Sequence, residues 1–255
     1  MKIFREIFGR IWAAWAMIAF VGTMIIFFIP FFLFAYFQPE PKKTHRFIAY
    51  SRVWMTVFLN LIGCPLKKIG LQHFQSGQAS IVVCNHNSFM DIPISSPAIP
   101  SGNKTIAKIE MSRIPLFGIL YKTGSVLVDR KSDLSRKESY VKMKQVLQMG
   151  LHMCIYPEGT RNKSAEPLKP FHAGAFRLAI ETKCPIIPAL IFNTRKVLPA
   201  TKTFYAMPHP ISIHFLEPQY ASPDESIDAF KQRIFNVMSN YYTANVTGHR
   251  NNASG

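Results

Sequence analysis

The chain has 255 residues, 48% of them hydrophobic, and carries a formal net charge of +16. Its lysines and arginines are spread along the sequence and are not grouped with stacking aromatic residues, so the composition argues against a nucleic-acid-binding protein. The same charge suits a membrane surface with anionic headgroups, or substrates that carry phosphates.

Residues 1–63 predict a membrane-associated helical segment. No residue from Ile11 to Phe37 is charged, and about 20 apolar residues are enough to cross the core of a bilayer. Pro30 interrupts this run, which predicts a kink or a return of the chain toward the same face. Basic residues flank the run on both sides and favour the return, while a single spanning anchor is the alternative. The apolar stretch Phe47–Ile62 predicts a second helix that lies in the interface.

Strands and helices alternate over residues 64–243. Strands are predicted near Ser80–Cys84, Thr105–Lys108, Ser125–Val128, His152–Tyr156, Ile186–Ile191 and Ile211–Phe215. Helices are predicted near Phe89–Ile94, Ser135–Gln148, Gly174–Thr182 and Asp224–Tyr242. Such alternation predicts one α/β domain with a mostly parallel central sheet flanked by helices. The polar residues 244–255 are expected to form a disordered tail.

A histidine and a carboxylate stand five positions apart in Asn85-His86-Asn87-Ser88-Phe89-Met90-Asp91. A neutral imidazole can take a proton from an alcohol, and Asp91 could hold the ring of His86 in the useful tautomer. Ser88 and Asp91 have the spacing of a capping box, which would place Ser88 at the N-cap and Asp91 at the third helical position, pointing back toward His86. The alternative is that Asp91 only caps the helix and His86 is an ordinary loop residue.

Three further segments follow in order: one that runs from Lys108 to Gly118 and continues to Arg130, then Tyr156-Pro157-Glu158-Gly159-Thr160-Arg161-Asn162, then Cys184-Pro185-Ile186-Ile187-Pro188-Ala189. Together with the His-x4-Asp element they resemble the four blocks of the glycerolipid acyltransferases, in particular the 1-acyl-glycerol-3-phosphate (lysophosphatidate) acyltransferases. The family pattern also implies a lysine or arginine just before the glycine that follows the third block. This chain departs from the pattern there, with His172 in Phe171-His172-Ala173-Gly174.

Acyl transfer needs a base, charge stabilisation and a grip on the acceptor. His86 is the expected base, with Asp91 as its support. Lys108 is expected at a strand end, where its ammonium could stabilise developing negative charge; a solvated surface lysine is the alternative. Arg130 is a second candidate for anion contact.

The segment Glu158-Gly159-Thr160-Arg161 is the expected substrate contact. Gly159 lets the backbone approach a ligand closely, and Arg161 offers a planar fork of donors suited to the acceptor phosphate. Glu158 is expected to pair with Arg161 and to orient it. The alternative is a polar turn between a strand and a helix.

Other chemistries lack their usual sequence patterns. The chain has no Gly-x-Ser-x-Gly, Gly-x-Gly-x-x-Gly or Gly-x4-Gly-Lys-Ser/Thr segment, which disfavours a serine hydrolase, a dinucleotide enzyme and a P-loop protein. Its cysteines, Cys64, Cys84, Cys154 and Cys184, lack C-x2-C spacing and are expected to be buried, reduced thiols. We expect no metal and no cofactor.

The sequence therefore predicts a membrane-bound acyltransferase. The expected reaction moves a fatty acyl group from acyl-CoA or acyl carrier protein to the free hydroxyl of lysophosphatidate, without an acyl-enzyme. The resemblance implies a catalytic domain that faces the cytosol. Two alternatives stay open: a different lysolipid acceptor, such as a lyso-aminolipid, and a membrane-anchored basic module that only binds lipid.

Overall fold

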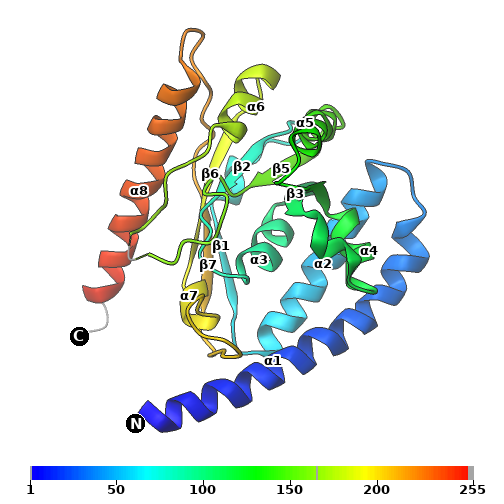
Figure 1. Cartoon of the computed structure of the whole chain (residues 1–255), viewed down its shortest axis with the longest axis vertical. Coiled ribbons are helices and arrows are strands. Elements are labelled where there is room, and N and C mark those ends of the chain that lie inside the picture. Colours follow the sequence, from blue (N-terminus) through cyan, green and yellow to red (C-terminus); the bar gives the residue numbers. More distant parts are fainter. Residues whose placement is uncertain (1, 165, 252–255) are drawn as a thin grey trace.

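The computed structural model describes residues 2–164 and 166–251, which contain a seven-stranded sheet in the order β1-β7-β6-β2-β5-β3-β4 (Figure 1). The strands are β1 (Leu66–Ile69), β2 (Ile81–Cys84), β3 (Asn103–Lys108), β4 (Ser125–Val128), β5 (His152–Ile155), β6 (Ile186–Phe192) and β7 (Ile211–Phe215). Neighbouring strands from β6 to β4 are parallel, β7 is antiparallel to β6, and β1 is parallel to β7. The mostly parallel sheet expected from the sequence is confirmed.

Helices cover both faces of the sheet. Ile81 and Val83 of β2 pack with α5 (Asp133–Gln148), α6 (Gly174–Thr182) and α8 (Ile227–Asn251) in one hydrophobic cluster. Val82 and Cys84 belong to the cluster on the opposite face, because successive side chains of a strand point to opposite sides. All residues of β2, β5 and β6 are buried, as expected for strands with helices on both faces.

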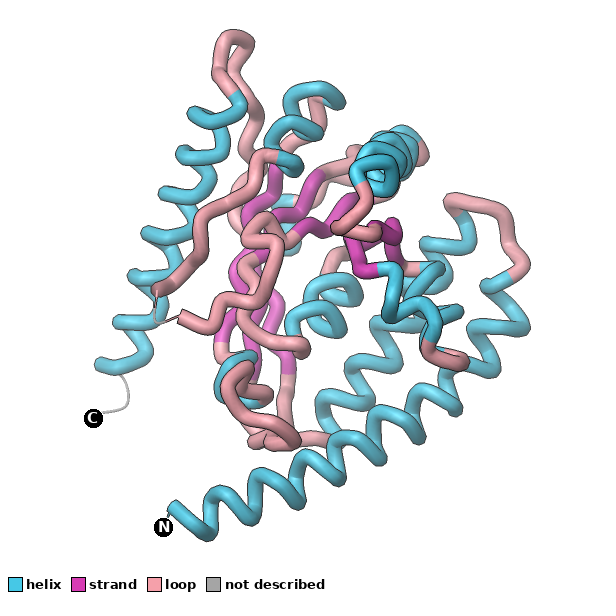
Figure 2. The backbone as a smooth tube through the Cα atoms, viewed as in Figure 1, coloured by secondary structure: helices cyan, strands magenta, loops and turns pink. Residues whose placement is uncertain are grey.

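The opposite face carries α3 (Asp91–Ala98), α4 (Phe117–Thr123) and a helical hairpin formed by α1 and α2. The first helix, α1 (Lys2–Phe31), runs through Pro30 and continues as the π-helical turn η1 (Phe32–Tyr36); α2 (Lys42–Leu61) then runs back along it. The return predicted at Pro30 therefore occurs later, at residues 37–41. Figure 2 shows the hairpin on one side of the sheet and α8 on the other.

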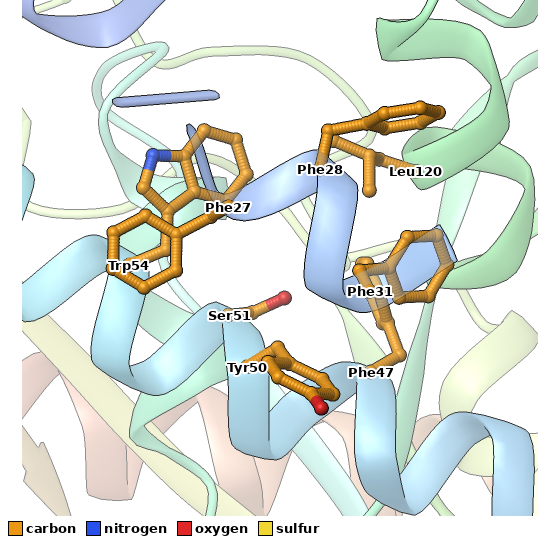
Figure 3. A pocket seen from close by; sticks show the side chains of 8 residues that line it. All are labelled: Phe27, Phe28, Phe31, Phe47, Tyr50, Ser51, Trp54 and Leu120. Carbon is orange, nitrogen blue, oxygen red and sulfur yellow. The ribbon is translucent and has the colours of Figure 1, made fainter. Parts of the chain in front are cut away.

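Side chains fill the space between the two helices of the hairpin. Figure 3 shows a pocket lined by Phe27, Phe28, Phe31, Phe47, Tyr50, Ser51, Trp54 and Leu120. The volume of this pocket is only about 10 Å³. One water molecule needs about this much room, so α1 and α2 are in close contact here. The indole of Trp54 also donates to Thr23 Oγ1 over 2.9 Å, which ties the middle of α2 to α1.

The hairpin and the sheet share one hydrophobic core. Ala19 and Phe31 of α1 belong to the same buried cluster as Val82 and Phe215 of the sheet. Arg52 of α2 donates to the carbonyls of residues 97, 99 and 100 at the end of α3. The predicted division at residue 63 therefore separates two parts of the sequence that pack as one body.

Several shorter elements differ from the sequence prediction. The edge strand β1, the helices α4 and α7 (Thr194–Val197), and the 3-10 turns η2 (Leu71–His73) and η3 (Ile109–Arg113) were not expected. Helix α8 extends to Asn251, so residues 244–251 are helical where the sequence predicted a disordered tail. The rest of that tail, 252–255, lies outside the described residues.

Candidate active site

The sheet order explains why four separate segments meet. His86 follows β2, the segment 156–162 follows β5, Lys108 ends β3, and the fourth segment forms β6. These strands are adjacent and parallel. Parallel strands place their carboxyl ends at one edge of a sheet, where ligands of α/β proteins commonly bind. The first three segments are thus collected at this edge, while the fourth, Cys184–Ala189, leads into β6 and forms its first half beside β2.

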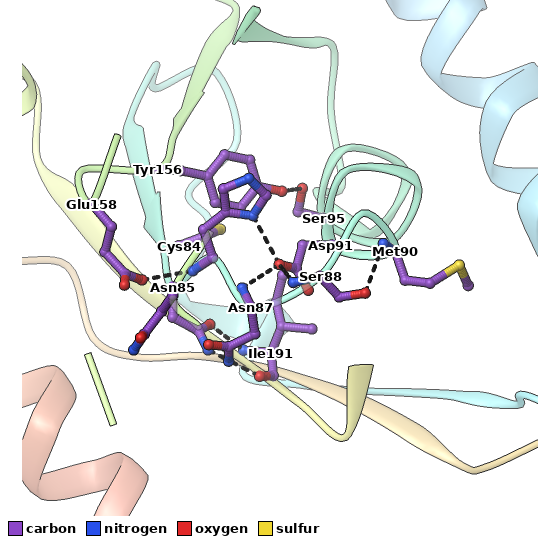
Figure 4. Close-up of polar contacts among 12 residues, drawn as sticks. Cys84, Asn85, Asn87, Ser88, Met90, Asp91, Ser95, Tyr156, Glu158 and Ile191 are labelled. Carbon is purple, nitrogen blue, oxygen red and sulfur yellow. Dashed lines mark hydrogen bonds and ion pairs between the residues drawn. The ribbon is translucent and has the colours of Figure 1, made fainter. Parts of the chain in front are cut away.

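The imidazole of His86 is held by Asp91. Their Nδ1 and Oδ2 atoms lie 2.9 Å apart, and the same carboxylate oxygen accepts the backbone N–H groups of Asn87 and Ser88 at 2.6 and 2.7 Å (Figure 4). A carboxylate oxygen only accepts, so Nδ1 carries the proton and Nε2 is left with a free lone pair. Asp91 is fully buried, while 14% of the His86 side chain is exposed and lines a cavity.

The turn that joins this pair differs in detail from the predicted capping box. α3 begins at Asp91 itself, with Met90 at its N-cap. The Asp91 carboxylate does reach back to Ser88, but the Ser88 hydroxyl accepts from the Met90 N–H at 3.2 Å and donates to the Leu198 carbonyl at 2.8 Å. Asp91 therefore fixes the turn and the imidazole together, and His86 is not an ordinary loop residue.

The aromatic ring of Tyr156 packs against the imidazole of His86. The ring centroids of Tyr156 and His86 lie 4.5 Å apart with an interplanar angle of 34°. The Tyr156 hydroxyl is 2.7 Å from Ser95 Oγ, and burial raises the pKa of this phenol well above its ordinary value. Beneath it lie the free thiols of Cys84 and Cys154, with their sulfur atoms 3.8 Å apart.

Glu158 does not pair with Arg161 as the sequence suggested. It is only 2% exposed, and its carboxylate accepts the backbone N–H groups of His86 at 2.7 Å and Lys169 at 3.0 Å. The bond to His86 joins the loop after β2 to the loop after β5, and the bond to Lys169 lies within the latter loop. Burial raises the pKa of the Glu158 carboxyl, and the two N–H donors partly offset this. The prediction was wrong because the side chain is directed into the core and not toward solvent.

The guanidinium of Arg161 instead stacks on Phe89. Its Cζ atom lies 3.5 Å from the centroid of the ring. Arg161 makes no hydrogen bond or ion pair with any other residue that the structure describes. Arg130 lies nearby and donates to the Gly159 carbonyl. The Thr160 hydroxyl accepts from Lys169 Nζ at 2.7 Å.

Gly159 occupies a position that needs a glycine. Its φ is +70°, in the left-handed region, and a Cβ atom there would lie 2.8 Å from the ring of His172. His172 thus packs over the glycine of the third segment, and it is not among the residues that line the cavity.

A cavity of about 1450 Å³ lies between the carboxyl edge of the sheet and the hairpin. Its polar end contains His86, Lys108, Arg130, Arg161, Lys163 and Lys169. Its apolar end is formed by residues of α1, α2 and α4, including Ala13, Ala16, Phe20, Phe47, Phe58 and Leu120. No Asp or Glu of the described chain lines it. The volume exceeds the roughly 300 to 1,000 Å³ of ordinary small-molecule pockets, and the lining suits a long amphiphile with an anionic head.

Sequence reasoning missed Arg195, which lies on α7 beyond the fourth segment. Its guanidinium donates to Asn87 Oδ1 and to the Asn162 carbonyl, both at 2.9 Å, and to the Ser164 carbonyl at 2.8 Å. Arg195 thus connects the loop of the His86–Asp91 pair to the loop after β5. No local pattern marks it, because its partners lie far away in the sequence.

The described residues contain no group of three or more His, Cys, Asp and Glu side chains that could hold a metal ion. That the chain works without a metal or a cofactor stays a prediction.

Comparisons with known proteins agree with this geometry. The acyltransferase family model matches residues 65–192. A Helicobacter pylori 1-acyl-sn-glycerol-3-phosphate acyltransferase is 29% identical over 211 residues, covering 82% of this chain and 84% of that protein. A coconut (Cocos nucifera) protein of the same name is 32% identical over 171 residues, which are 66% of this chain and 54% of that protein. This chain therefore spans about half the length of the coconut relative.

The fold is also that of a solved relative. The crystal structure of the 1-acyl-sn-glycerophosphate (LPA) acyltransferase PlsC from Thermotoga maritima superposes with a TM-score of 0.76 at 20% identity, covering 96% of this chain and 97% of that one. The matched family model covers all four segments and the His86–Asp91 pair. The chain belongs to the acyltransferase family.

Proposed function

We propose that this chain is a 1-acyl-sn-glycerol-3-phosphate acyltransferase, which transfers an acyl group from a thioester to the free hydroxyl of lysophosphatidate and forms phosphatidate. One observation carries the proposal: the free Nε2 of His86 lies at the cationic end of a cavity whose other end is apolar. The names of the relatives support the same reaction.

In this reaction His86 acts as a general base. Its Nε2 takes the hydroxyl proton while the hydroxyl oxygen attacks the thioester carbonyl. The tetrahedral intermediate then collapses, the C–S bond breaks, and the departing thiolate takes the proton back from the imidazolium. Asp91 stabilises the imidazolium between these steps. Acyl transfer is direct, so the scheme requires no acyl-enzyme and no metal or cofactor.

Cations at the polar end meet the negative charges of the substrates. Arg161 holds the acceptor phosphate, because its N–H groups are not used by any other described residue. Lys108, exposed at the end of β3, stabilises the oxyanion, and Arg130 provides a further anion contact. With five cations and no carboxylate among the described lining residues, the site favours a phosphorylated acceptor over a lyso-aminolipid without phosphate.

An assay with several acceptors separates the proposed lysophosphatidate acyltransferase from an enzyme with another lysolipid acceptor and from a protein that only binds lipid. Purified protein in detergent micelles is given a radiolabelled acyl-CoA or acyl carrier protein thioester with lysophosphatidate, monoacylglycerol or a lyso-aminolipid. We expect transfer to lysophosphatidate, and a rate lower by roughly 10²- to 10⁴-fold when His86→Ala replaces the wild type. Equal use of a phosphate-free acceptor would contradict the proposed substrate. Lipid binding without turnover of any thioester would favour the binding module.

Membrane attachment belongs to the same proposal. Among the described helices, the one from Lys2 to Tyr36 is long and apolar enough to cross a membrane. Exposed apolar residues line one side of this helix, first seven and then four positions apart, namely Phe4, Ile11, Ile18, Ile25, Ile29 and Leu33. Its other side packs on the domain along its length, from Gly9 to Ala35. We therefore propose that α1 lies in the plane of a membrane on the cytosolic side and does not cross it.

Cysteine labelling tests this orientation. Position 3 lies near the start of the helix from Lys2 to Tyr36, and position 43 lies at the start of α2, just after the other end of that helix. The helix is about 52 Å long, which is enough to span a bilayer. A helix in the membrane plane exposes both positions to a cytosolic thiol reagent. Labelling from opposite sides would instead show a spanning anchor, and extraction by high salt alone would contradict insertion.

A further inference from the structure

We infer that Phe89 is a positioning residue for the acceptor: its ring holds the guanidinium of Arg161 in the orientation that receives the phosphate. This inference deepens the proposed function and rests on it. Phe89 lies between His86 and Asp91 in the sequence, is 61% exposed and lines the cavity.

Three arginines of the site differ in how their N–H groups are used. Arg195 donates to Asn87, Asn162 and Ser164, and Arg130 donates to the Gly159 carbonyl. Arg161 donates to no other residue of the described chain, and its contact is the stack on Phe89 at 3.5 Å. Of the three, Arg161 is therefore the one with all of its donors available to a ligand.

Stacking fixes the plane of a guanidinium without using its donors. All N–H groups of a guanidinium lie in its plane, so a ring against one face leaves the edges free for bidentate contact with a phosphate. A carboxylate partner would fix Arg161 as well, but it would occupy the same edge and neutralise the charge. Glu158 makes its bonds elsewhere, which leaves Phe89 as the contact that orients Arg161.

The position of Phe89 also relates the phosphate grip to the base. The turn from residue 86 to 91 is fixed by the Asp91 carboxylate, which holds the N–H groups of Asn87 and Ser88 and the imidazole of His86. Phe89 projects from this same turn. One short segment thus sets the place of Nε2 and, through the ring, the place of the guanidinium, so the hydroxyl and phosphate of one acceptor meet groups at a fixed separation.

The test compares Phe89→Leu with Phe89→Tyr in the full-length protein. Leucine keeps an apolar side chain but has no aromatic face, while tyrosine keeps the face. A cation–π contact of this kind corresponds to about a 3- to 30-fold change in binding. We expect Phe89→Leu to raise the KM for lysophosphatidate by that factor, with kcat and the KM for the donor within about twofold, and we expect Phe89→Tyr to restore the acceptor KM.

Two controls identify the cause. Phe37→Leu removes an exposed phenylalanine that does not line the cavity, and it should leave the acceptor KM unchanged. In an Arg161→Lys background, Phe89→Leu should add little further loss, because the ring acts through the guanidinium. Melting curves of each variant report on folding.

Failure of this inference is separable from failure of the proposed function. If Arg161→Lys weakens acceptor use and Phe89→Leu does not, the phosphate grip stands and the role of Phe89 is overturned. If Phe89→Leu lowers kcat at an unchanged acceptor KM, the ring acts on the His86–Asp91 turn and the inference is wrong. If Arg161→Lys has no effect on acceptor use, the proposed phosphate contact itself fails.

Discussion

The two edges of the sheet each hold a histidine with a different environment. At the carboxyl edge, His86 lines the cavity and donates from Nδ1 to a carboxylate. At the amino edge, His152 begins β5, is 3% exposed, and accepts the Ser80 N–H at Nδ1 over 3.1 Å. Burial, assisted by the nearby His45, lowers the pKa of His152 to about 4.

The comparison shows what separates a base from a structural histidine. In the proposed mechanism, the Asp91 carboxylate stabilises the imidazolium of His86, and the cavity lets a substrate reach Nε2. At His152, the backbone N–H of Ser80 donates to Nδ1 and so disfavours protonation of that nitrogen. The side chain is also buried, so no solvent stabilises a positive charge on the ring. Adjacent strands thus carry one imidazole that lines a cavity beside a carboxylate and one that burial disfavours from taking up a proton.

The largest effect is expected at His86. His86→Ala should lower kcat by roughly 10²- to 10⁴-fold, because a positioned base is lost. His152→Asn, in contrast, should keep kcat within about twofold, since Asn can still accept the Ser80 N–H. Turnover of a labelled thioester by both variants, with melting curves, checks the pair. A retained rate above about a tenth for His86→Ala would remove it from the mechanism.

Asp91→Asn is expected to reduce kcat strongly as well, because the imidazolium loses its counter-charge. Part of the effect is structural, since Asp91 also holds the N–H groups of Asn87 and Ser88. A melting measurement beside the rate separates the two contributions. A normal rate in a protein with a lowered melting temperature would assign Asp91 to the turn alone.

The next effect concerns stability against acid. Above pH 6.5, His152 is neutral in both the folded and unfolded chains, so its contribution to stability is complete. As the pH falls from 6.5 to about 4, the unfolded chain binds a proton that the folded one refuses, and this should cost up to about 3 kcal/mol of the free energy of unfolding. His152→Asn should remove this loss in denaturant titrations at pH 7 and pH 4.5. His209→Asn, on a loop, is the control, and an equal gain there would contradict the assignment.

Arg161 should give a smaller, substrate-selective effect. Arg161→Lys keeps the charge but loses the fork, so we expect the KM for lysophosphatidate to rise about tenfold while the donor KM is unchanged. Steady-state kinetics with each substrate varied in turn measures both. Equal losses toward acceptor and donor would indicate a structural role.

The smallest effect is expected at Arg195. Arg195→Lys loses bonds that join the His86–Asp91 turn to the loop after β5, so kcat should fall about fivefold. The neighbouring Lys196→Ala changes an exposed side chain and serves as the matched control. If the two variants behave alike, Arg195 does not position the turn.

Local signals in the sequence determined much of this molecule. The strands Ser125–Val128 and Ile211–Phe215 and the helix Gly174–Thr182 have the predicted bounds, because hydrophobic pattern and flanking turn residues act over a few positions. The His86–Asp91 pair was also predictable, since both residues belong to one turn. The order of strands and helices then predicted a parallel sheet, which brings the loops after its strands together.

Tertiary structure alone decided how those loops contact one another. Glu158 bonds the backbone of His86 across 72 positions of sequence, and Arg195 bonds Asn87 across 108. The stack of Arg161 on Phe89 likewise joins loops from different strands. A charged side chain in a sequence has many possible partners, and which of them lies within reach depends on the sheet order and on which side chains the core encloses. Local sequence patterns specify neither the sheet order nor the side chains that the core encloses.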